Sequence, residues 1–354
     1  MLVDEFDFEL PEGLIASFPL ENRDNSRLLH YSRSSELTRH RKFNEIVDIL
    51  NEGDILVRNT SKVLALRFKI QDTQNSPAEI LLTENLDTKK TLWSALVKPG
   101  KKIKESKESK KSKKQFLIAN TIPINIWRDG DNFFVEFNST DDFEIAVRDY
   151  GLMPLPPYMK RDATALDKER YQTIYAQDHQ RGASIAAPTA GLHFTDRINS
   201  ALINKGVEII DTCLHVGLGT FMPIRTDEVQ SHEMHEEYYE ISPTNWQKIL
   251  NAKKQKRRVI AVGSTSTRVL ETLGQAKDYE SPEILSGKTK IYIYPGYEFR
   301  IIDGLITNFH LPKSTLILMI SAFLGSEKVK EIYAEAIKQE YRFYSYGDCC
   351  FFDS

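Results

Sequence analysis

The chain has little cysteine and no long apolar run. Only three of its 354 residues are cysteines, Cys213, Cys349 and Cys350, and their spacing fits neither a disulfide framework nor a zinc-binding motif. The longest apolar run, residues 316–324, is far shorter than a membrane-spanning helix. The first residues, MLVDEFDFELPEG, are acidic where a signal peptide needs a basic flank and an apolar stretch. We therefore expect a cytoplasmic protein without a structural metal.

The chain also carries little net charge. The formal net charge is −3, with 41% hydrophobic and 27% charged residues, which is typical of a globular protein. A nucleic-acid partner would therefore have to be held by local basic patches, since the molecule as a whole does not attract it. The length allows two domains, or one large domain with an insert.

Helical and strand patterns alternate in two separate parts of the chain. Thr195 is placed to cap a helix over residues 196–205, and Gly206 ends it. The other predicted helices are 39–50, 246–253, 263–276, 312–325 and 327–340, and the predicted strands are 55–58, 207–216, 258–262, 291–294 and 305–309. This alternation predicts an α/β body.

The stretch from residue 62 to about 143 differs from the rest. Short runs rich in β-formers alternate with polar turns, and Asp129-Gly130-Asp131 marks a hairpin. We therefore expect an inserted small antiparallel β-barrel or sandwich over residues 61–149, with residues 1–60 and 150–354 forming the main α/β domain. Within the insert, residues 98–114 contain nine lysines and two glutamates. This composition favours a solvated hairpin tip, and a phosphate-binding finger is the alternative.

Three histidines fall where strands and helices meet. His193 lies just before a predicted helix, His215 lies near the end of a predicted strand, and His310 follows Asn308 between a strand and a helix. Ligands of α/β proteins bind at such carboxyl ends of strands. A single histidine is more often a core residue, but three in this position predict a shared pocket.

The segment GSTSTR (263–268) joins a predicted strand to a helix. Exposed backbone N–H groups at a helix start favour an anion, and Arg268 can pair with it. The hydroxyls of Ser264, Thr265 and Thr267 are the other candidate ligands, with plain helix capping as the alternative. The segment is neither a Walker loop nor a dinucleotide-binding motif.

Other polar and aromatic clusters allow more than one interpretation. In HEMHEE (232–237) the histidines are three residues apart rather than four, so a structural or substrate-contacting role is favoured over a metal site. Tyr346, with the aromatic residues at 341, 343 and 344, forms either a wall that stacks a base or part of a core strand. The basic run comprises Lys253, Lys254, Lys256, Arg257 and Arg258, and it is a candidate RNA-binding patch.

Several long segments resemble a known family. APTAGLHFT, LHVGLGTF, AVGSTSTR, IYPGYEF, TNFHLPKSTL and YRFYSYGD, together with FDFELPEGLIASFPLENRDNSRLL near the start, resemble the S-adenosylmethionine:tRNA ribosyltransferase-isomerases of queuosine biosynthesis. The likeness spans the chain, apart from residues 98–114 and 276–288. The departures are small: Asn59-Thr60-Ser61 replaces the usual Asn-Asp-Thr, Ser264 and Thr267 replace the commoner Thr and Val, and Cys349-Cys350 replaces small or apolar residues.

The resemblance implies a reaction and its partners. The ribosyl part of S-adenosylmethionine would move to 7-aminomethyl-7-deazaguanine in the wobble position of a tRNA with a G-U-N anticodon, giving epoxyqueuosine, adenine and methionine. It also implies a three-layer α/β/α body with an inserted barrel, and no bound metal or cofactor, because S-adenosylmethionine is a co-substrate. We also expect a monomer.

We assign hypothetical roles on this basis. His193, His215 and His310 would move protons, and Arg268 with the 264–267 turn would hold the methionine carboxylate. Glu236 or Asp348 would hydrogen-bond a ribose or the deazaguanine edge. Two alternatives remain: a methyltransferase that uses the same co-substrate, although the glycine-rich loop of that class is not evident near the N-terminus, and a non-enzymatic RNA-binding module.

Overall fold

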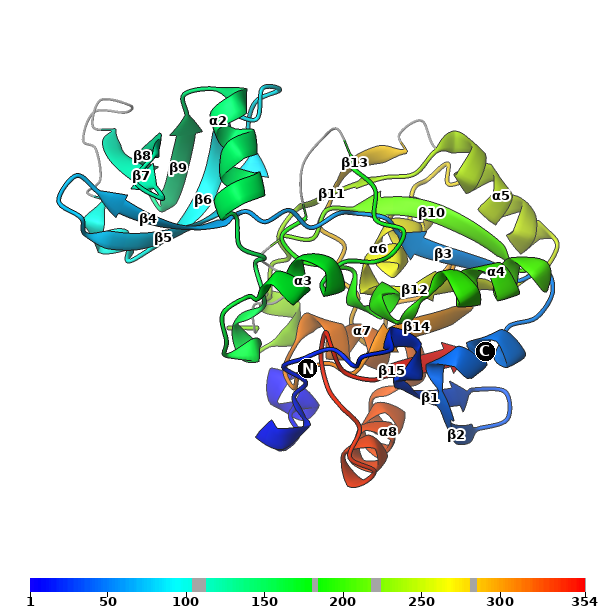
Figure 1. Cartoon of the computed structure of the whole chain (residues 1–354). Coiled ribbons are helices and arrows are strands. Elements are labelled where there is room, and N and C mark those ends of the chain that lie inside the picture. The colour runs from blue at the N-terminus through cyan, green and yellow to red at the C-terminus, as the bar shows by residue number, and fades with distance from the viewer. Residues whose placement is uncertain (104–112, 180–183, 218–223, 281–284, 354) are drawn as a thin grey trace.

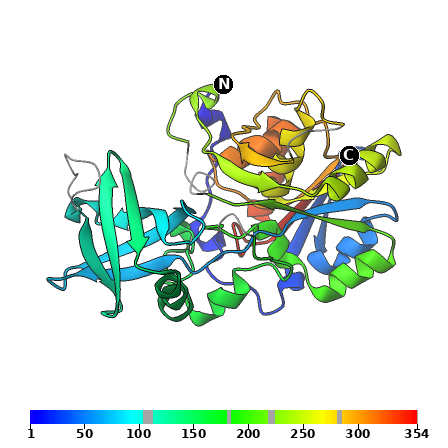
Figure 2. The ribbon, with the colours of Figure 1, turned by 90° about the horizontal axis from the view of Figure 1, so that it is seen from above.

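The computed structural model describes residues 1–103, 113–179, 184–217, 224–280 and 285–353. Two bodies lie side by side in it: an α/β body and a smaller β-barrel at one end (Figures 1 and 2). The barrel is inserted between β3 and the segment that leads to α3, as its position in the chain requires. The predicted fold class is therefore confirmed.

The α/β body is built on a nine-stranded mixed sheet in the order β13-β11-β10-β3-β12-β14-β15-β1-β2. The central strands β10, β3, β12 and β14 are parallel, so their carboxyl ends share one edge. The bounds are β1 Arg27–Ser32, β2 Leu37–Lys42, β3 Ile55–Asn59, β10 Glu208–Leu214, β11 Glu237–Glu240, β12 Val259–Val262, β13 Ser286–Thr289, β14 Gly304–Asn308 and β15 Cys349–Asp353.

Alternate residues of the central strands enter two different cores. Ile55 and Val57 pack with helices α5, α6, α7 and α8 on one face, whereas Leu56 and Ile260 pack with α1 and α4 on the other. This alternation follows from the two-residue period of a strand, and burial of both faces explains the continuous apolar runs. The helices are α1 Ile46–Ile49, α3 Ala165–Arg170, α4 Asp196–Asn204, α5 Pro243–Lys254, α6 Gly263–Gly274, α7 Thr315–Leu324 and α8 Ser326–Lys338.

The insert closes into a six-stranded antiparallel barrel in the order β4-β5-β6-β9-β8-β7. Its strands are β4 Arg67–Asp72, β5 Pro77–Asn85, β6 Leu92–Lys98, β7 Lys114–Ile118, β8 Ile122–Asp129 and β9 Asn132–Phe137, and α2 (Thr140–Ile145) follows them. The barrel has its own apolar core, which includes Trp93, Phe116 and Phe143. We keep residues 61–149 as our proposed limits for the insert. Most of the lysine-rich segment 98–114 lies outside the described residues.

Two predicted elements were wrong. Residues 39–50 are not one helix: 37–42 form the edge strand β2, which pairs with β1 in a hairpin, and only Ile46–Ile49 are α-helical. Pairing with β1 therefore overrides the helical pattern. Residues 291–294 form no strand, and the neighbouring residues 286–289 pair with β11 instead.

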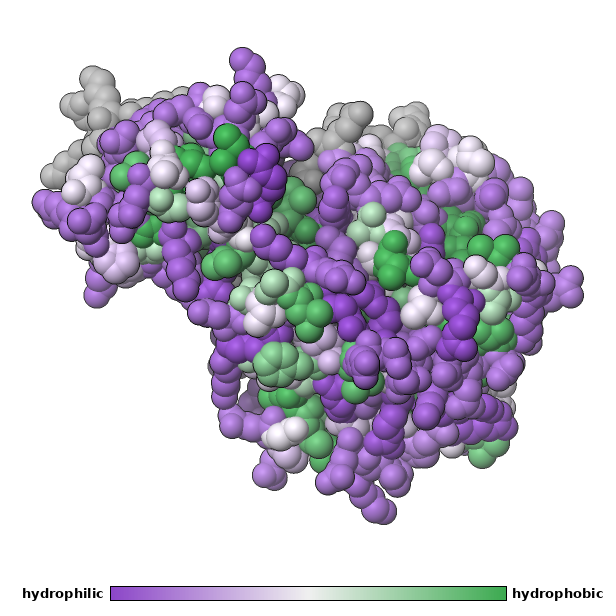
Figure 3. Space-filling model, viewed as in Figure 1, coloured by the Kyte–Doolittle hydropathy of each residue, from purple (hydrophilic) through white to green (hydrophobic). Residues whose placement is uncertain are grey.

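The surface shows no single dominant apolar area on the face in Figure 3, where apolar residues are scattered among hydrophilic ones. None of the described helices is both long enough and apolar enough to cross a membrane.

Candidate active site

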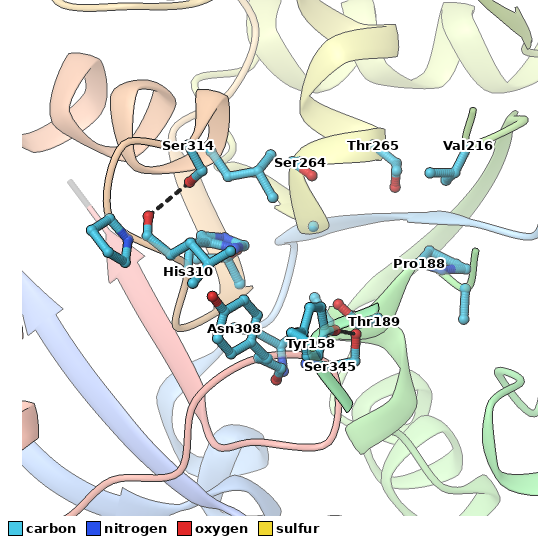
Figure 4. Close-up of a pocket in the computed structure, with 18 residues that line it drawn as sticks. Tyr158, Pro188, Thr189, Val216, Ser264, Thr265, Asn308, His310, Ser314 and Ser345 are labelled. Atoms are coloured by element: carbon cyan, nitrogen blue, oxygen red, sulfur yellow. Dashed lines mark hydrogen bonds between the residues drawn. The ribbon is translucent and has the colours of Figure 1, made fainter. Parts of the chain in front are cut away.

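A hollow of about 810 Å³ opens at the sheet edge where β12 and β14 end (Figure 4). This is where an open α/β sheet is expected to bind its ligand. The residues that line it come from six separate parts of the chain: Tyr158; Ala187, Pro188, Thr189 and Ala190; Val216; Gly263, Ser264 and Thr265; Thr307, Asn308, His310, Leu311, Pro312, Ser314 and Leu316; Tyr344 and Ser345.

His310 lies on the wall of this hollow, between β14 and α7. Its Nε2 is 2.7 Å from Thr307 Oγ1, and its backbone N–H donates to the Tyr333 hydroxyl at 3.1 Å. Burial lowers the pKa of the ring to about 3, so the imidazole is neutral near pH 7. In the tautomer in which Nε2–H donates to Thr307 Oγ1, the other ring nitrogen, Nδ1, is an acceptor.

Asn308 holds the C-terminal loop against the end of β14. Its side-chain Nδ2 donates to the carbonyls of Tyr344 at 3.1 Å and Asp348 at 3.4 Å. Because carbonyls only accept, the amide orientation is determined. Asn308 Oδ1 is buried and has no partner in the described structure. This oxygen is therefore a candidate acceptor for a substrate N–H group.

His193 lies behind Asn308, on the wall of a second, smaller hollow. Its Nε2 is 3.1 Å from Asn308 Nδ2, and its Nδ1 is 2.7 Å from Ser26 Oγ. Since the amide nitrogen donates, Nε2 accepts and Nδ1 carries the proton that it donates to Ser26. Burial lowers the pKa of His193 to about 3. Both ring nitrogens are thus occupied, an arrangement that fits a positioning residue better than a free base.

Helix α6 points its N-terminus into the main hollow. Gly263 makes the turn from β12 with a φ of 85°, a conformation that glycine adopts without strain. Ser264 and Thr265 follow and line the hollow, and Thr265 Oγ1 is buried without a partner in the described structure. Thr267 instead donates to the Gly263 carbonyl at 3.1 Å. The backbone N–H groups of this turn are suited to an anion.

Arg268 lies one turn further along α6 and faces an adjoining hollow that shares Ser264 and Thr265. It forms a buried ion pair with Glu237, and burial lowers its pKa to about 10. The sequence placed Arg268 on a ligand carboxylate. In the structure its Nη1 pairs with Glu237, whereas Nε and Nη2 are buried without a partner among the described residues, so a ligand carboxylate on Arg268 stays a prediction.

His215 follows β10 and does not line the main hollow, although its neighbour Val216 does. Its Nε2 is 3.7 Å from Cys213 Sγ, and its Nδ1 is buried without a partner among the described residues. Burial, together with the charge of His179, lowers its pKa to about 4.

Three side chains beside His215 are able to ligate a metal: His179, Cys213 and Glu240, whose ligand atoms lie within 4.8 Å of one another. His179 already uses both nitrogens, with Glu240 Oε1 at 2.9 Å and Thr60 Oγ1 at 3.1 Å. The group is therefore a complete hydrogen-bonded network as it stands. The histidines of segment 232–237 do not belong to it.

The three remaining substrate-binding candidates lie outside the main hollow. Glu236 is about half exposed and contacts Lys288 and Lys290 at 3.8 and 3.6 Å. Tyr346 lines the second hollow and donates to Asp167 at 2.9 Å. Asp348 is buried and accepts the backbone N–H groups of Arg27 and Arg342, both at 2.8 Å. Asp348 therefore shapes the C-terminal loop and does not face the ligand space.

The basic run 253–258 lies at the start of β12, at the sheet edge opposite the hollow. Most of its charges are already used: Lys253 pairs with Asp303, Lys254 with Glu280, Arg257 with Glu208, and Arg258 with Asp54 and Asp353. Lys256 is exposed. RNA binding by this run stays a prediction, and the ion pairs favour a structural role.

Sequence reasoning named Tyr344 as part of an aromatic wall but missed Tyr158, which stacks on it in the wall of the hollow. The rings of Tyr158 and Tyr344 stack with their centroids 4.1 Å apart, and the Tyr158 hydroxyl contacts Ser345 Oγ. Tyr344 has a φ of 73°, which is strained for a bulky residue. The Pro-rich segment around Tyr158 was expected to be a crossing only, and nothing in its pattern indicated that it returns from the barrel to the active site.

Comparisons with known proteins agree with this architecture. The family described as "Queuosine biosynthesis protein" matches residues 3–352. The S-adenosylmethionine:tRNA ribosyltransferase-isomerase of Desulforamulus reducens is 45% identical over 354 residues, covering 98% of this chain and 98% of that protein. Its namesakes from Desulfitobacterium hafniense and Thermosipho melanesiensis are 46% and 43% identical over 351 residues, and the share of each chain covered is 98% and 99%, respectively.

A solved structure supports the same conclusion. The crystal structure of S-adenosylmethionine tRNA ribosyltransferase from Thermotoga maritima is 32% identical, covers 98% of this chain and 99% of its own, and superposes with a TM-score of 0.54. The chain therefore belongs to the queuosine biosynthesis family of S-adenosylmethionine:tRNA ribosyltransferase-isomerases, and it is a transferase.

Proposed function

We propose that this enzyme transfers and isomerises the ribosyl group of S-adenosylmethionine onto 7-aminomethyl-7-deazaguanine at the tRNA wobble position. The products would be epoxyqueuosine in tRNA, adenine and methionine. The observation that carries the proposal is the convergence of family segments from distant parts of the chain on one hollow, with His310, Asn308 and the start of α6 on its walls. The names of the relatives supply the co-substrate and the RNA.

The chemistry needs a proton acceptor beside the sulfonium. The positive sulfur acidifies the C5′ protons of the sugar, and removal of one gives an ylide that can expel adenine. Of the three histidines, His310 is the one on the wall of the main hollow with a nitrogen left for this step. We therefore assign the first proton transfer to His310, and we assign His193 to holding Asn308 in place.

The later steps need a neutral amine and a good leaving group. The aminomethyl group of the acceptor base must lose its charge before it attacks the sugar, and methionine leaves as a neutral thioether while a ribose oxygen closes the epoxide. The unpartnered Asn308 Oδ1 is placed to accept a hydrogen bond from the acceptor base. His215 does not line the hollow and its Nδ1 is buried, so this proposal gives it no contact with the substrate.

The methionine carboxylate is assigned to the N-terminus of α6. Gly263, Ser264 and Thr265 present backbone N–H groups and hydroxyls to the hollow, and a helix start stabilises an anion. Arg268, which follows this turn in α6, is held in place by its ion pair with Glu237. Glu236 and Asp348 receive no direct role here, because one is half exposed and the other is tied to backbone N–H groups.

The product distinguishes this reaction from its alternatives. The protein is incubated with labelled S-adenosylmethionine and a precursor tRNA, and the small molecules are separated by chromatography. We expect adenine and methionine in equal amounts. Release of S-adenosylhomocysteine would instead identify a methyltransferase, and an unchanged co-substrate with RNA binding would identify a module without this activity. His310→Ala should lower the rate of adenine release by about 10²–10⁴-fold.

A further inference from the structure

The smaller hollow beside the active site has a distinctive charge pattern. It measures about 310 Å³, shares Ser345 with the main hollow, and has His193 and Ser26 in its wall. Two arginines, Arg23 and Arg170, complete its rim. No described residue that lines it is acidic, so the hollow offers donors and positive charge without a carboxylate of its own.

Backbone carbonyls hold the two arginines in place. Arg23 Nη1 donates to Gln172 O at 3.1 Å, and Arg170 donates to the carbonyls of Leu20 and Glu21 at 2.5 and 3.0 Å. Neither arginine forms an ion pair within the described part of the chain. Burial lowers the pKa of Arg23, and so does the positive charge of Arg170, while Glu169 acts in the opposite direction. Two like charges held this close are suited to an oxyanion between them.

The same two arginines also face outward. They line a wider, open hollow of about 930 Å³ together with Glu21, Asp24 and Glu169. Asp24 is paired with Arg197 at 2.8 Å, so its charge is compensated. Arg23 and Arg170 thus lie between solvent and the wall that contains His193, where an extended chain can reach them from outside.

An exposed aromatic ring lies next to this rim. Phe18 has 55% of its surface exposed and directly precedes Pro19 and Leu20, which line the hollow. Its carbonyl accepts from Arg342 Nη2 at 2.5 Å, and the Arg161 guanidinium lies 4.3 Å from its ring centroid. The guanidinium lies over one face of the ring, and the exposed remainder of an aromatic ring is a typical stacking platform for an unpaired base.

Phosphate-binding arginines and a stacking ring together are the chemistry of single-stranded RNA recognition. We propose that Arg23 and Arg170 bind a backbone phosphate of the tRNA anticodon loop and that Phe18 stacks on a neighbouring base, so that the target nucleotide is presented to the main hollow. This rests on the proposed function only in taking tRNA as the acceptor. A free carboxylate would need the arginines but not the exposed ring.

Binding measured apart from catalysis tests the proposal. The variants are Arg23→Gln/Arg170→Gln and Phe18→Ala, and the control is Lys328→Gln/Lys330→Gln, which removes the same charge from helix α8. Fluorescence anisotropy with an anticodon stem–loop RNA gives Kd at several salt concentrations. We expect each of the two test variants to raise Kd about tenfold, with the salt slope of the arginine variant reduced by about 0.7 per lost phosphate contact. The lysine control should match wild type.

The opposite results are equally clear. An equal loss in the lysine control would mean that only net charge matters, and a raised KM for S-adenosylmethionine with unchanged RNA binding would assign the arginines to the co-substrate carboxylate. Either result would overturn the proposal. If the double variant does not fold by circular dichroism, Phe18→Ala and Arg170→Lys decide the question. Failure of wild-type protein to release adenine would refute the proposed reaction, and the binding measurement would still stand.

Discussion

Replacing His310 by glutamine removes a buried imidazole without removing its hydrogen-bonding capacity. Burial lowers the pKa of this ring to about 3, compared with about 6.5 in an unfolded chain. Between these two values the unfolded state binds a proton that the folded state does not. The free energy of unfolding therefore falls as the pH is lowered through 6.5, and the loss continues until the folded pKa is reached.

The expected size of this effect follows from the linkage relation. At pH 5, protonation of this histidine stabilises the unfolded state by about 2 kcal/mol, whereas the ring in the folded state stays neutral. His193, with a pKa of about 3, and His215, with a pKa of about 4, add similar amounts. Together the three rings lower the free energy of unfolding at pH 5 by about 6 kcal/mol. This is comparable to the whole free energy of unfolding of a typical domain.

Urea unfolding followed by circular dichroism at pH 7.5 and pH 5 measures the effect. Wild-type protein should lose about 2 kcal/mol more stability between these pH values than His310→Gln does. Thr307→Val is the matched control: it removes the partner of Nε2 but keeps the imidazole buried, so its pH dependence should follow wild type. Equal pH dependence in wild type and His310→Gln would show that the folded ring takes up a proton, and the argument from burial would fail.

Two further predictions concern the supports of the site. Glu237→Gln leaves the buried Arg268 charge without its carboxylate and should lower the free energy of unfolding by about 3–5 kcal/mol in urea titrations; a loss below about 1 kcal/mol would show that the pair behaves like a surface ion pair. Asn308→Asp replaces the donor that holds two carbonyls of the C-terminal loop. It should cost about 1–3 kcal/mol per unpaired group and lower adenine release at saturating substrate, whereas a rise in KM alone would assign Asn308 to binding.

The sequence alone determined the fold class and the family. Continuous apolar strands alternating with capped helices require a sheet buried on both faces, and short β-rich runs with tight turns require a separate antiparallel unit. The long segments around His193, Ser264 and Asn308 also indicated the sheet edge that carries the site, because residues after parallel strands fall on one edge whatever their partners are.

Only the tertiary structure decided which residues face the ligand space. Strand order sets His310 on the wall of the main hollow, His193 behind Asn308, and Arg268 against Glu237. It also brings Tyr158 back from the end of the barrel insert to stack on Tyr344. Local sequence patterns record the period of a helix or strand but not the long-range partner of a side chain. That partner, through burial and hydrogen bonding, determines whether a histidine accepts a proton or an arginine binds a ligand.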